Sequence, residues 1–273
     1  MTPIDKSDVD LFLSNLLKKA LASYLHPVLS IMIKVHSIET FGAHEGPGIR
    51  FVLFVQGCMF KCLYCHNPDT ISLAGGTEMS AFDIVKQVLE VQPYFGPKGG
   101  FTVSGGEPLL QANALIPLFR LLKEHGIHIA VDTNGFPWND DVKELIEIAD
   151  LFLVDIKQIN NELHQKLTGQ SNENTLNLIS YLEKQGKQMW IRYVLLPGYT
   201  DNPEHLHEVG KRFGNFEHIE RLEILPYHEL GTYKYKELGM KYELEWIPMT
   251  THEQAEAAKA VFDQYFAKVV IRG

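Results

Sequence analysis

The sequence has few cysteines, a deficit of basic residues and no long apolar run. Only 3 of its 273 residues are cysteine, an odd number and too few for a disulfide-stabilised scaffold. It has 25 lysines and arginines against 34 aspartates and glutamates, and the net charge of −9 argues against binding to nucleic-acid phosphates. No apolar run approaches the roughly 20 residues that span a membrane. The N-terminus carries Asp5, Asp8 and Asp10, unlike a signal peptide, so we expect a cytoplasmic protein with no membrane or nucleic-acid partner.

What the sequence does contain is an alternation of short apolar runs with segments of helical periodicity. Hydrophobic residues make up 45% of the chain, enough for a full core. The runs predict strands at 50–56, 101–104, 128–132, 151–156, 189–196 and 221–225. The periodic segments predict helices near 81–92, 111–125, 140–149, 173–185, 203–213 and 251–267. This order predicts an α/β fold in which helices cover a parallel sheet, in one main domain.

The N-terminal segment has a different pattern. Leucines and alanines recur at helical spacing between Ser7, a candidate N-cap, and Pro27. We therefore expect an amphipathic helix at 7–26. Packing of this helix on the body of the protein is the ordinary role, and docking to a partner is the alternative.

Each predicted strand ends in a polar or glycine-rich cluster. In parallel α/β folds, ligands and chemistry are found at the carboxyl ends of the strands, so these clusters predict one shared site. One of them, Arg192, lies inside a buried strand, where a charge needs a carboxylate partner or a ligand. The clusters lie at 56–58, 104–108, 132–134, 155–157, 192–198 and 225–228.

All three cysteines, Cys58, Cys62 and Cys65, lie within eight residues and have the spacing C-x3-C-x2-C. Isolated buried cysteines rarely cluster in this way. A zinc site with His66 as fourth ligand is an alternative, but His66 directly follows Cys65, which makes a poor tetrahedral arrangement. The third interpretation is a 4Fe–4S cluster with three thiolate ligands, which leaves one iron open to a small molecule. An open iron suits a catalytic cluster.

This loop resembles the hallmark motif of the radical S-adenosylmethionine superfamily, including the aromatic Tyr64 between the second and third cysteines. The resemblance implies a partial, open (β/α)6 TIM-like barrel at 31–273, preceded by an N-terminal helical extension at 1–30. It also implies that S-adenosylmethionine binds the open iron and is cleaved reductively to a 5′-deoxyadenosyl radical.

The same resemblance implies roles for individual residues. The run 104–108 resembles the superfamily segment that holds the methionyl amino group. Around a monovalent cation, Na⁺ or K⁺, the resemblance places Asp132, Thr133 and Asp155, for which ordinary helix capping is the alternative. Lys157 supplies positive charge near a carboxylate, unless it is solvated. The implied catalytic residues are the three cysteines, Lys157 and Arg192, and the implied cofactor site comprises Tyr64, Cys65, His66, Gly105, Gly106, Glu107, Asp132, Asp155, Ile156, Lys157 and His228.

Within the superfamily the chain resembles the activating enzymes of glycyl radical enzymes, and in particular those of pyruvate formate-lyase. The resemblance lies in the segments 45–56, 65–68, 132–135, 190–193 and 225–231, with Glu45 standing where relatives usually carry Asp. It implies hydrogen abstraction from a backbone glycine of pyruvate formate-lyase, with an electron donor such as flavodoxin. Without further cysteines there is no additional cluster domain. The alternatives are an activase of another glycyl radical enzyme, a radical enzyme for a small molecule, and a zinc-binding interaction module.

Overall fold

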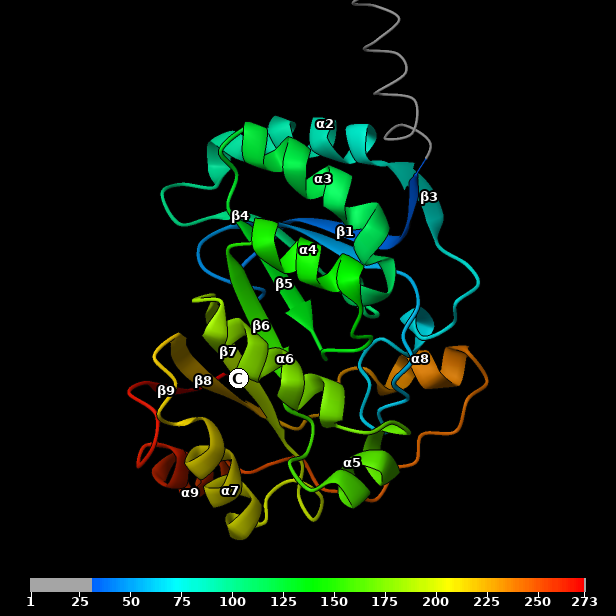
Figure 1. Ribbon diagram of the computed structural model, residues 1–273. Helices are drawn as coiled ribbons and strands as arrows, with labels where there is room; N and C mark the ends of the chain where they lie inside the picture. Colours follow the sequence, from blue (N-terminus) through cyan, green and yellow to red (C-terminus); the bar gives the residue numbers. More distant parts are fainter. Residues whose placement is uncertain (1–30, 273) are drawn as a thin grey trace, which may run out of the picture.

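The protein contains one nine-stranded sheet with helices packed against its outer face (Figure 1). The computed structural model describes residues 31–272, so the predicted extension 1–30 and its helix 7–26 lie outside the described residues. The strand order is β3-β1-β2-β4-β5-β6-β7-β8-β9. Neighbours from β2 to β9 are parallel, whereas β1 pairs antiparallel with β2 and β3. Within the described range the end strands do not pair with each other, so the barrel is open.

The elements have the following bounds. The strands are β1 Met32–Gly42, β2 Arg50–Val55, β3 Thr77–Ser80, β4 Gly100–Gly105, β5 Ile129–Thr133, β6 Leu151–Asp155, β7 Gln188–Leu195, β8 Ile219–Pro226 and β9 Val269–Ile271. The α-helices are α2 Ala81–Val91, α3 Ala112–Glu124, α4 Asp140–Ile148, α5 Asn161–Thr168, α6 Glu173–Lys184, α7 Pro203–Phe213, α8 Thr232–Glu237 and α9 His252–Phe262.

The predicted α/β fold with an open, partial barrel is confirmed. All six predicted strands are present as β2 and β4 to β8, and all six predicted helices are present as α2, α3, α4, α6, α7 and α9. The sequence did not predict β1, β3, β9, α5 or α8. The predicted cap of the first helix is also confirmed, because the Ser80 side chain accepts a hydrogen bond from the backbone N–H of Asp83.

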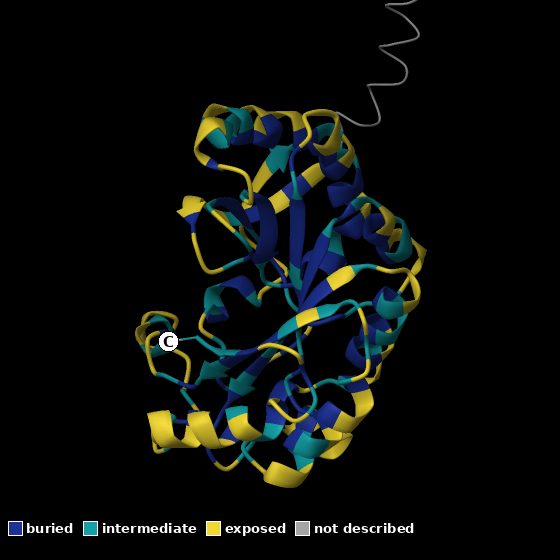
Figure 2. Ribbon diagram, turned by 90° about the vertical axis from the view of Figure 1, so that its left-hand side faces the viewer, coloured by how far each residue is buried: buried dark blue, intermediate teal, exposed yellow. Residues whose placement is uncertain are grey.

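The two faces of the sheet carry different kinds of side chain, and this difference creates the site. Alternate strand residues point to opposite faces. Outward residues such as Phe152 and Val154 of β6 join the large core under the helices. In Figure 2 the strands in the middle of the sheet are mostly dark blue, the colour of buried residues. A smaller apolar cluster comprises Ala130, Leu151, Leu153 and Trp190. By the same alternation Asp132, Asp155 and Arg192 continue these inner rows toward the carboxyl ends. The inner face is therefore apolar at one end and charged at the other.

Candidate active site

A cavity of about 740 Å³ lies at the carboxyl ends of the parallel strands. Its size falls in the range of sites for small ligands and cofactors. Every predicted strand-end cluster contributes at least one residue to its wall, so these clusters do meet at one place. The predicted site residues that line it are Cys58, Cys62, Tyr64, Cys65, His66, Gly105, Gly106, Asp132, Thr133, Asp155, Lys157, Arg192 and His228.

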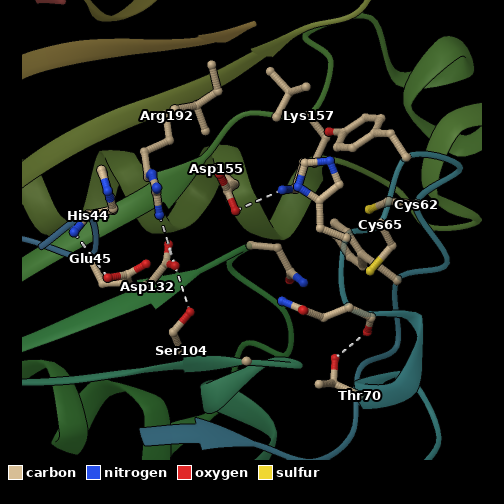
Figure 3. Close-up of a pocket in the computed structure, with 18 of the residues that line it drawn as sticks. His44, Glu45, Cys62, Cys65, Thr70, Ser104, Asp132, Asp155, Lys157 and Arg192 are labelled. Atoms are coloured by element: carbon tan, nitrogen blue, oxygen red, sulfur yellow. Dashed lines mark hydrogen bonds and ion pairs between the residues drawn. The ribbon is translucent and has the colours of Figure 1, made fainter. Parts of the chain in front are cut away.

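The cavity has two ends of different chemistry (Figure 3). At one end are the three cysteines, which we name the cysteine end. At the other are His44, Glu45, Asp132 and Arg192. Arg272 lines the cavity and contacts Glu223, which also contacts Arg192, so we count it with these residues and name the group the charged end. Asp155 and Lys157 lie between the two.

The cysteine loop is attached to α5 by backbone hydrogen bonds. The N–H of Lys61 donates to the carbonyl of Thr168 at 2.7 Å, and the N–H of Leu63 donates to that of Leu167 at 3.0 Å. On another side, the Tyr235 hydroxyl of α8 donates to the carbonyl of Cys65 at 3.0 Å. Two elements that the sequence did not predict therefore hold the loop in place.

The three thiols fit a multi-iron cluster better than a single metal ion. They are free and line one cavity. Yet no three Cys, His, Asp or Glu side chains within residues 31–272 are grouped closely enough to hold one ion. His66 is also engaged elsewhere, because its Nε2 lies 3.1 Å from the carbonyl of His228 and the two rings lie 4.4 Å apart. Three soft donors spread around one cavity match an iron–sulfur cluster with a free corner.

Burial makes these thiols poor acids on their own. It raises the pKa of Cys58 to about 12 and also raises those of Cys62 and Cys65, while the ammonium of Lys157 offsets this only in part. Thiolates at this position therefore need additional positive charge, which iron bound here would provide.

The glycine-rich end of β4 packs directly against the start of the cysteine loop. Gly105 has a φ of +107°, a conformation that side chains rarely adopt. A Cβ on Gly106 would lie 2.2 Å from the carbonyl oxygen of Gly57. Both positions therefore require glycine, and this close approach lets the backbone of β4 line the cavity.

Glu107 and Ile156 are predicted cofactor residues that do not line the cavity. The buried Glu107 carboxylate accepts hydrogen bonds from Thr133 Oγ1 at 2.6 Å and from the N–H groups of Leu109 and Asn134. Burial nevertheless raises the pKa of Glu107 to about 8. The side chain thus joins β4 to β5, and its contact with a cofactor stays a prediction.

The acidic residues of the predicted cation site each have a cationic partner in the protein. Asp132 Oδ2 accepts hydrogen bonds from Ser104 at 2.8 Å and Arg192 Nη1 at 3.0 Å, while Asp132 Oδ1 is buried without a partner. Asp155 Oδ2 lies 2.8 Å from Lys157 Nζ. The cation site at Asp132, Thr133 and Asp155 therefore stays a prediction.

Lys157 is not solvated. Its side chain is 13% exposed, and its ammonium lies 5.7 Å from the centroid of the Tyr64 ring. Burial is the largest single effect and lowers the pKa of Lys157, but Asp155, Tyr64 and Cys62 together raise it, and the net shift is upward. Lys157 is therefore a buried cation beside the cysteines.

The predicted carboxylate partner of Arg192 is confirmed, and there are two. Besides Asp132, the fully buried Glu223 of β8 lies 3.7 Å from Arg192 Nε. Burial lowers the pKa of Arg192, but the carboxylates raise it above its ordinary value.

Sequence reasoning missed several residues of the site. Glu223 lies within a predicted buried strand, so the argument used for Arg192 would have found it. Asn134, whose side-chain amide lies 3.6 Å from Cys58 Sγ, belongs to the predicted cluster 132–134 but was not singled out as a site residue. Arg272, which directly follows the short β9, gave no comparable signal. His44 lies on the loop between β1 and β2 and lines the charged end. None of the described helices is long and apolar enough to cross a membrane.

Comparison with known sequences gives a consistent set of relatives. Residues 52–209 match the model of the radical SAM superfamily. The chain is 41% identical over 245 residues to the pyruvate formate-lyase 1-activating enzyme of Escherichia coli K12, covering 89% of this chain and 100% of that protein. It is 44% identical over 233 residues to the pyruvate formate-lyase-activating enzyme of Streptococcus mutans, covering 82% of this chain and 89% of that protein.

Solved structures show the same fold. A domain of a pyruvate-formate lyase-activating enzyme from Bacteroides vulgatus matches with a TM-score of 0.55 and 26% identity, covering 64% of this chain and 99% of that chain. Streptococcus suis SuiB bound to S-adenosylmethionine matches with a TM-score of 0.64 and 15% identity, covering 100% of this chain and 58% of that chain. At that identity the second likeness concerns the fold alone.

Proposed function

Because this chain belongs to the radical S-adenosylmethionine superfamily and, within it, to the family of the pyruvate formate-lyase activating enzymes, we propose that it activates a pyruvate formate-lyase by removing a hydrogen atom from one of its backbone glycines. The observation that carries the proposal is the arrangement of the cavity. Three free thiols line one end and leave the charged end for a second, larger ligand.

Membership of the superfamily implies S-adenosylmethionine and a 4Fe–4S cluster as cofactors. In the proposal, Cys58, Cys62 and Cys65 bind three irons and leave the fourth to the methionyl group. When bound, the cluster supplies the electron that cleaves S-adenosylmethionine into methionine and a 5′-deoxyadenosyl radical. The electron comes from a one-electron donor such as flavodoxin.

The proposed hydrogen transfer breaks one bond and forms one bond. A C–H bond at the glycine Cα breaks and a C–H bond at C5′ of the adenosyl radical forms. The products are 5′-deoxyadenosine and a glycyl radical on the partner. Glycine suits this role because it lacks a side chain, so its loop can enter a narrow cavity, and the flanking amides stabilise the radical.

Residues of this chain bind and orient the ligands. The backbone of Gly105 and Gly106, which lines the cavity, contacts the methionyl amino group, and a monovalent cation, Na⁺ or K⁺, binds beside the methionyl carboxylate near Asp132, Thr133 and Asp155. The remaining predicted contacts surround the adenosyl moiety and the methionyl carboxylate, namely Tyr64, His66, Ile156, Lys157 and His228.

Anaerobic activation tests the proposal. The reconstituted protein, containing about four irons, is mixed with a one-electron reductant, S-adenosylmethionine and purified pyruvate formate-lyase. We expect a glycyl-radical doublet in electron paramagnetic resonance, together with 5′-deoxyadenosine. If the protein cleaves S-adenosylmethionine but produces a doublet only in a different glycyl radical enzyme, the assignment of the partner is wrong.

A further inference from the structure

The inner face of the barrel holds a buried carboxylate that the proposed chemistry does not use. Glu223 of β8 is 0% exposed and is the direct register partner of Arg192 on β7. A buried carboxylate is stable only with charged or hydrogen-bonding partners. The partners of Glu223 therefore determine the electrostatics beside Arg192.

Three guanidinium groups surround Glu223. Its Oε1 lies 3.2 Å from Arg221 Nε, and 3.1 Å from both Nε and Nη2 of Arg272. Its Oε2 lies 3.7 Å from Arg192 Nε, and neither of these two buried atoms has a hydrogen-bond partner. Glu223 is thus bound closely by two arginines and lies just beyond hydrogen-bond distance of the third.

The three arginines differ in what holds their guanidinium groups in place. Arg221 lies 3.2 Å above the centroid of the Trp190 ring, part of the small apolar cluster, and does not line the cavity. Arg192 and Arg272 both line it. Arg192 is bound on its other side by Asp132 at 3.0 Å. A shift of the Arg192 guanidinium toward Glu223 by less than about 1 Å would bring its Nε within hydrogen-bond distance of Glu223 Oε2 and would move its Nη1 from its place beside Asp132.

We propose that Arg272 is a positioning residue for Arg192: by neutralising Glu223 from its place directly after β9, it keeps Arg192 paired with Asp132 and directed into the charged end of the cavity. This inference rests on the proposed function and adds to it that the part of the charged end beside Arg192 receives the glycine segment of the partner. Without Arg272, Glu223 keeps only Arg221 as a close cationic partner and draws Arg192 away from that segment.

The variant Arg272→Met removes the charge and retains much of the volume. We expect the KM for the partner, or for a synthetic peptide carrying its glycine, to rise about ten-fold with kcat nearly unchanged. Release of 5′-deoxyadenosine without partner reports on the cysteine end and should change less than two-fold. Arg120→Met, which breaks an exposed pair on the outer helices with Glu144, is the matched control. An unchanged KM in Arg272→Met would overturn the proposal.

A double variant separates positioning from direct contact. If Arg272 acts through Glu223, the added change Glu223→Gln removes the competing charge and should return the KM toward the value of the unmodified protein. If Arg272 itself binds the partner, the double variant stays as weak as Arg272→Met, and the proposal is wrong. Arg272→Lys keeps the charge, so its KM should lie between those of the unmodified protein and Arg272→Met. This variant replaces Arg272→Met in the test if Arg272→Met does not fold.

Crystal structures give a readout that does not depend on the partner. In Arg272→Met we expect the distance between Arg192 Nε and Glu223 Oε2 to shorten to hydrogen-bond length and the bond to Asp132 to lengthen. An Arg192 that stays in place overturns the inference, even if the partner proves to be another glycyl radical enzyme. Conversely, failure to activate pyruvate formate-lyase, with the expected shift present, refutes only the proposed function.

Discussion

At the cysteine end the chain is held by backbone hydrogen bonds from α5, whereas at the charged end Arg192 is held by the carboxylates of Asp132 and Glu223. Backbone bonds do not depend on the identity of the side chains, so we expect that end to tolerate many substitutions outside the cysteines, the glycines and Tyr235. Ion pairs depend on each charge and on low exposure to water. Substitutions should therefore change the charged end more readily, and the two ends should respond differently to mutation.

Cys62→Ser should have the largest effect, because it removes one of three thiolate donors and no other cysteine replaces it. We expect loss of most bound iron and no detectable glycyl radical. Iron analysis and electron paramagnetic resonance measure this, with Arg120→Met as the control that keeps iron. Full iron content in Cys62→Ser would refute its role as a ligand.

Lys157→Met tests the region between the two ends. It leaves the mostly buried Asp155 without its partner, which costs about 3 kcal/mol of unfolding free energy. Urea denaturation measures the loss. The double variant with Asp155→Asn removes both charges and should recover much of the stability. If the single variant is as stable as the unmodified protein, the ion pair does not form in solution.

Gly106→Ala tests the backbone packing at the cysteine end. The new Cβ would lie 2.2 Å from Gly57 O, so the β4 end and the cysteine loop must separate, at a cost of about 2 kcal/mol. We expect less iron retained after reconstitution. Gly126→Ala is the control, with a φ of +68° but no atom near the added Cβ, and it should keep its iron. Equal iron in both variants would contradict the argument.

Ser104→Ala should have the smallest effect and concerns the charged end. It removes one hydrogen bond to Asp132 but leaves Arg192 paired, so we expect a loss of about 1 kcal/mol in denaturant unfolding. Ser37→Ala is the control and should change little, because Ser37 is exposed and its hydroxyl bonds only His36 among side chains of the described region. A loss above that of Lys157→Met would reverse the expected order.

Sequence periodicity found the six central β/α units because those strands are buried on both faces and read as continuous apolar runs. It missed β1, where buried and exposed positions are mixed, and β9, which has only three residues. It also missed α5 and α8, the two elements that hold the cysteine loop. Short or half-exposed elements carry too few apolar positions to stand out.

The order of residues within short segments of the sequence determined the three thiol donors and the strand-end clusters. Short segments are enough because they contain both the spacing of Cys58, Cys62 and Cys65 and the ends of the apolar runs. Only the tertiary structure decided which charges pair. Arg192 and Asp132 lie 60 residues apart in the sequence, and Arg272 and Glu223 lie 49 apart. Among 59 formally charged side chains, 25 basic and 34 acidic, many pairings are possible. The order and register of parallel strands select the ones that form, because they decide which side chains share the inner face of the barrel.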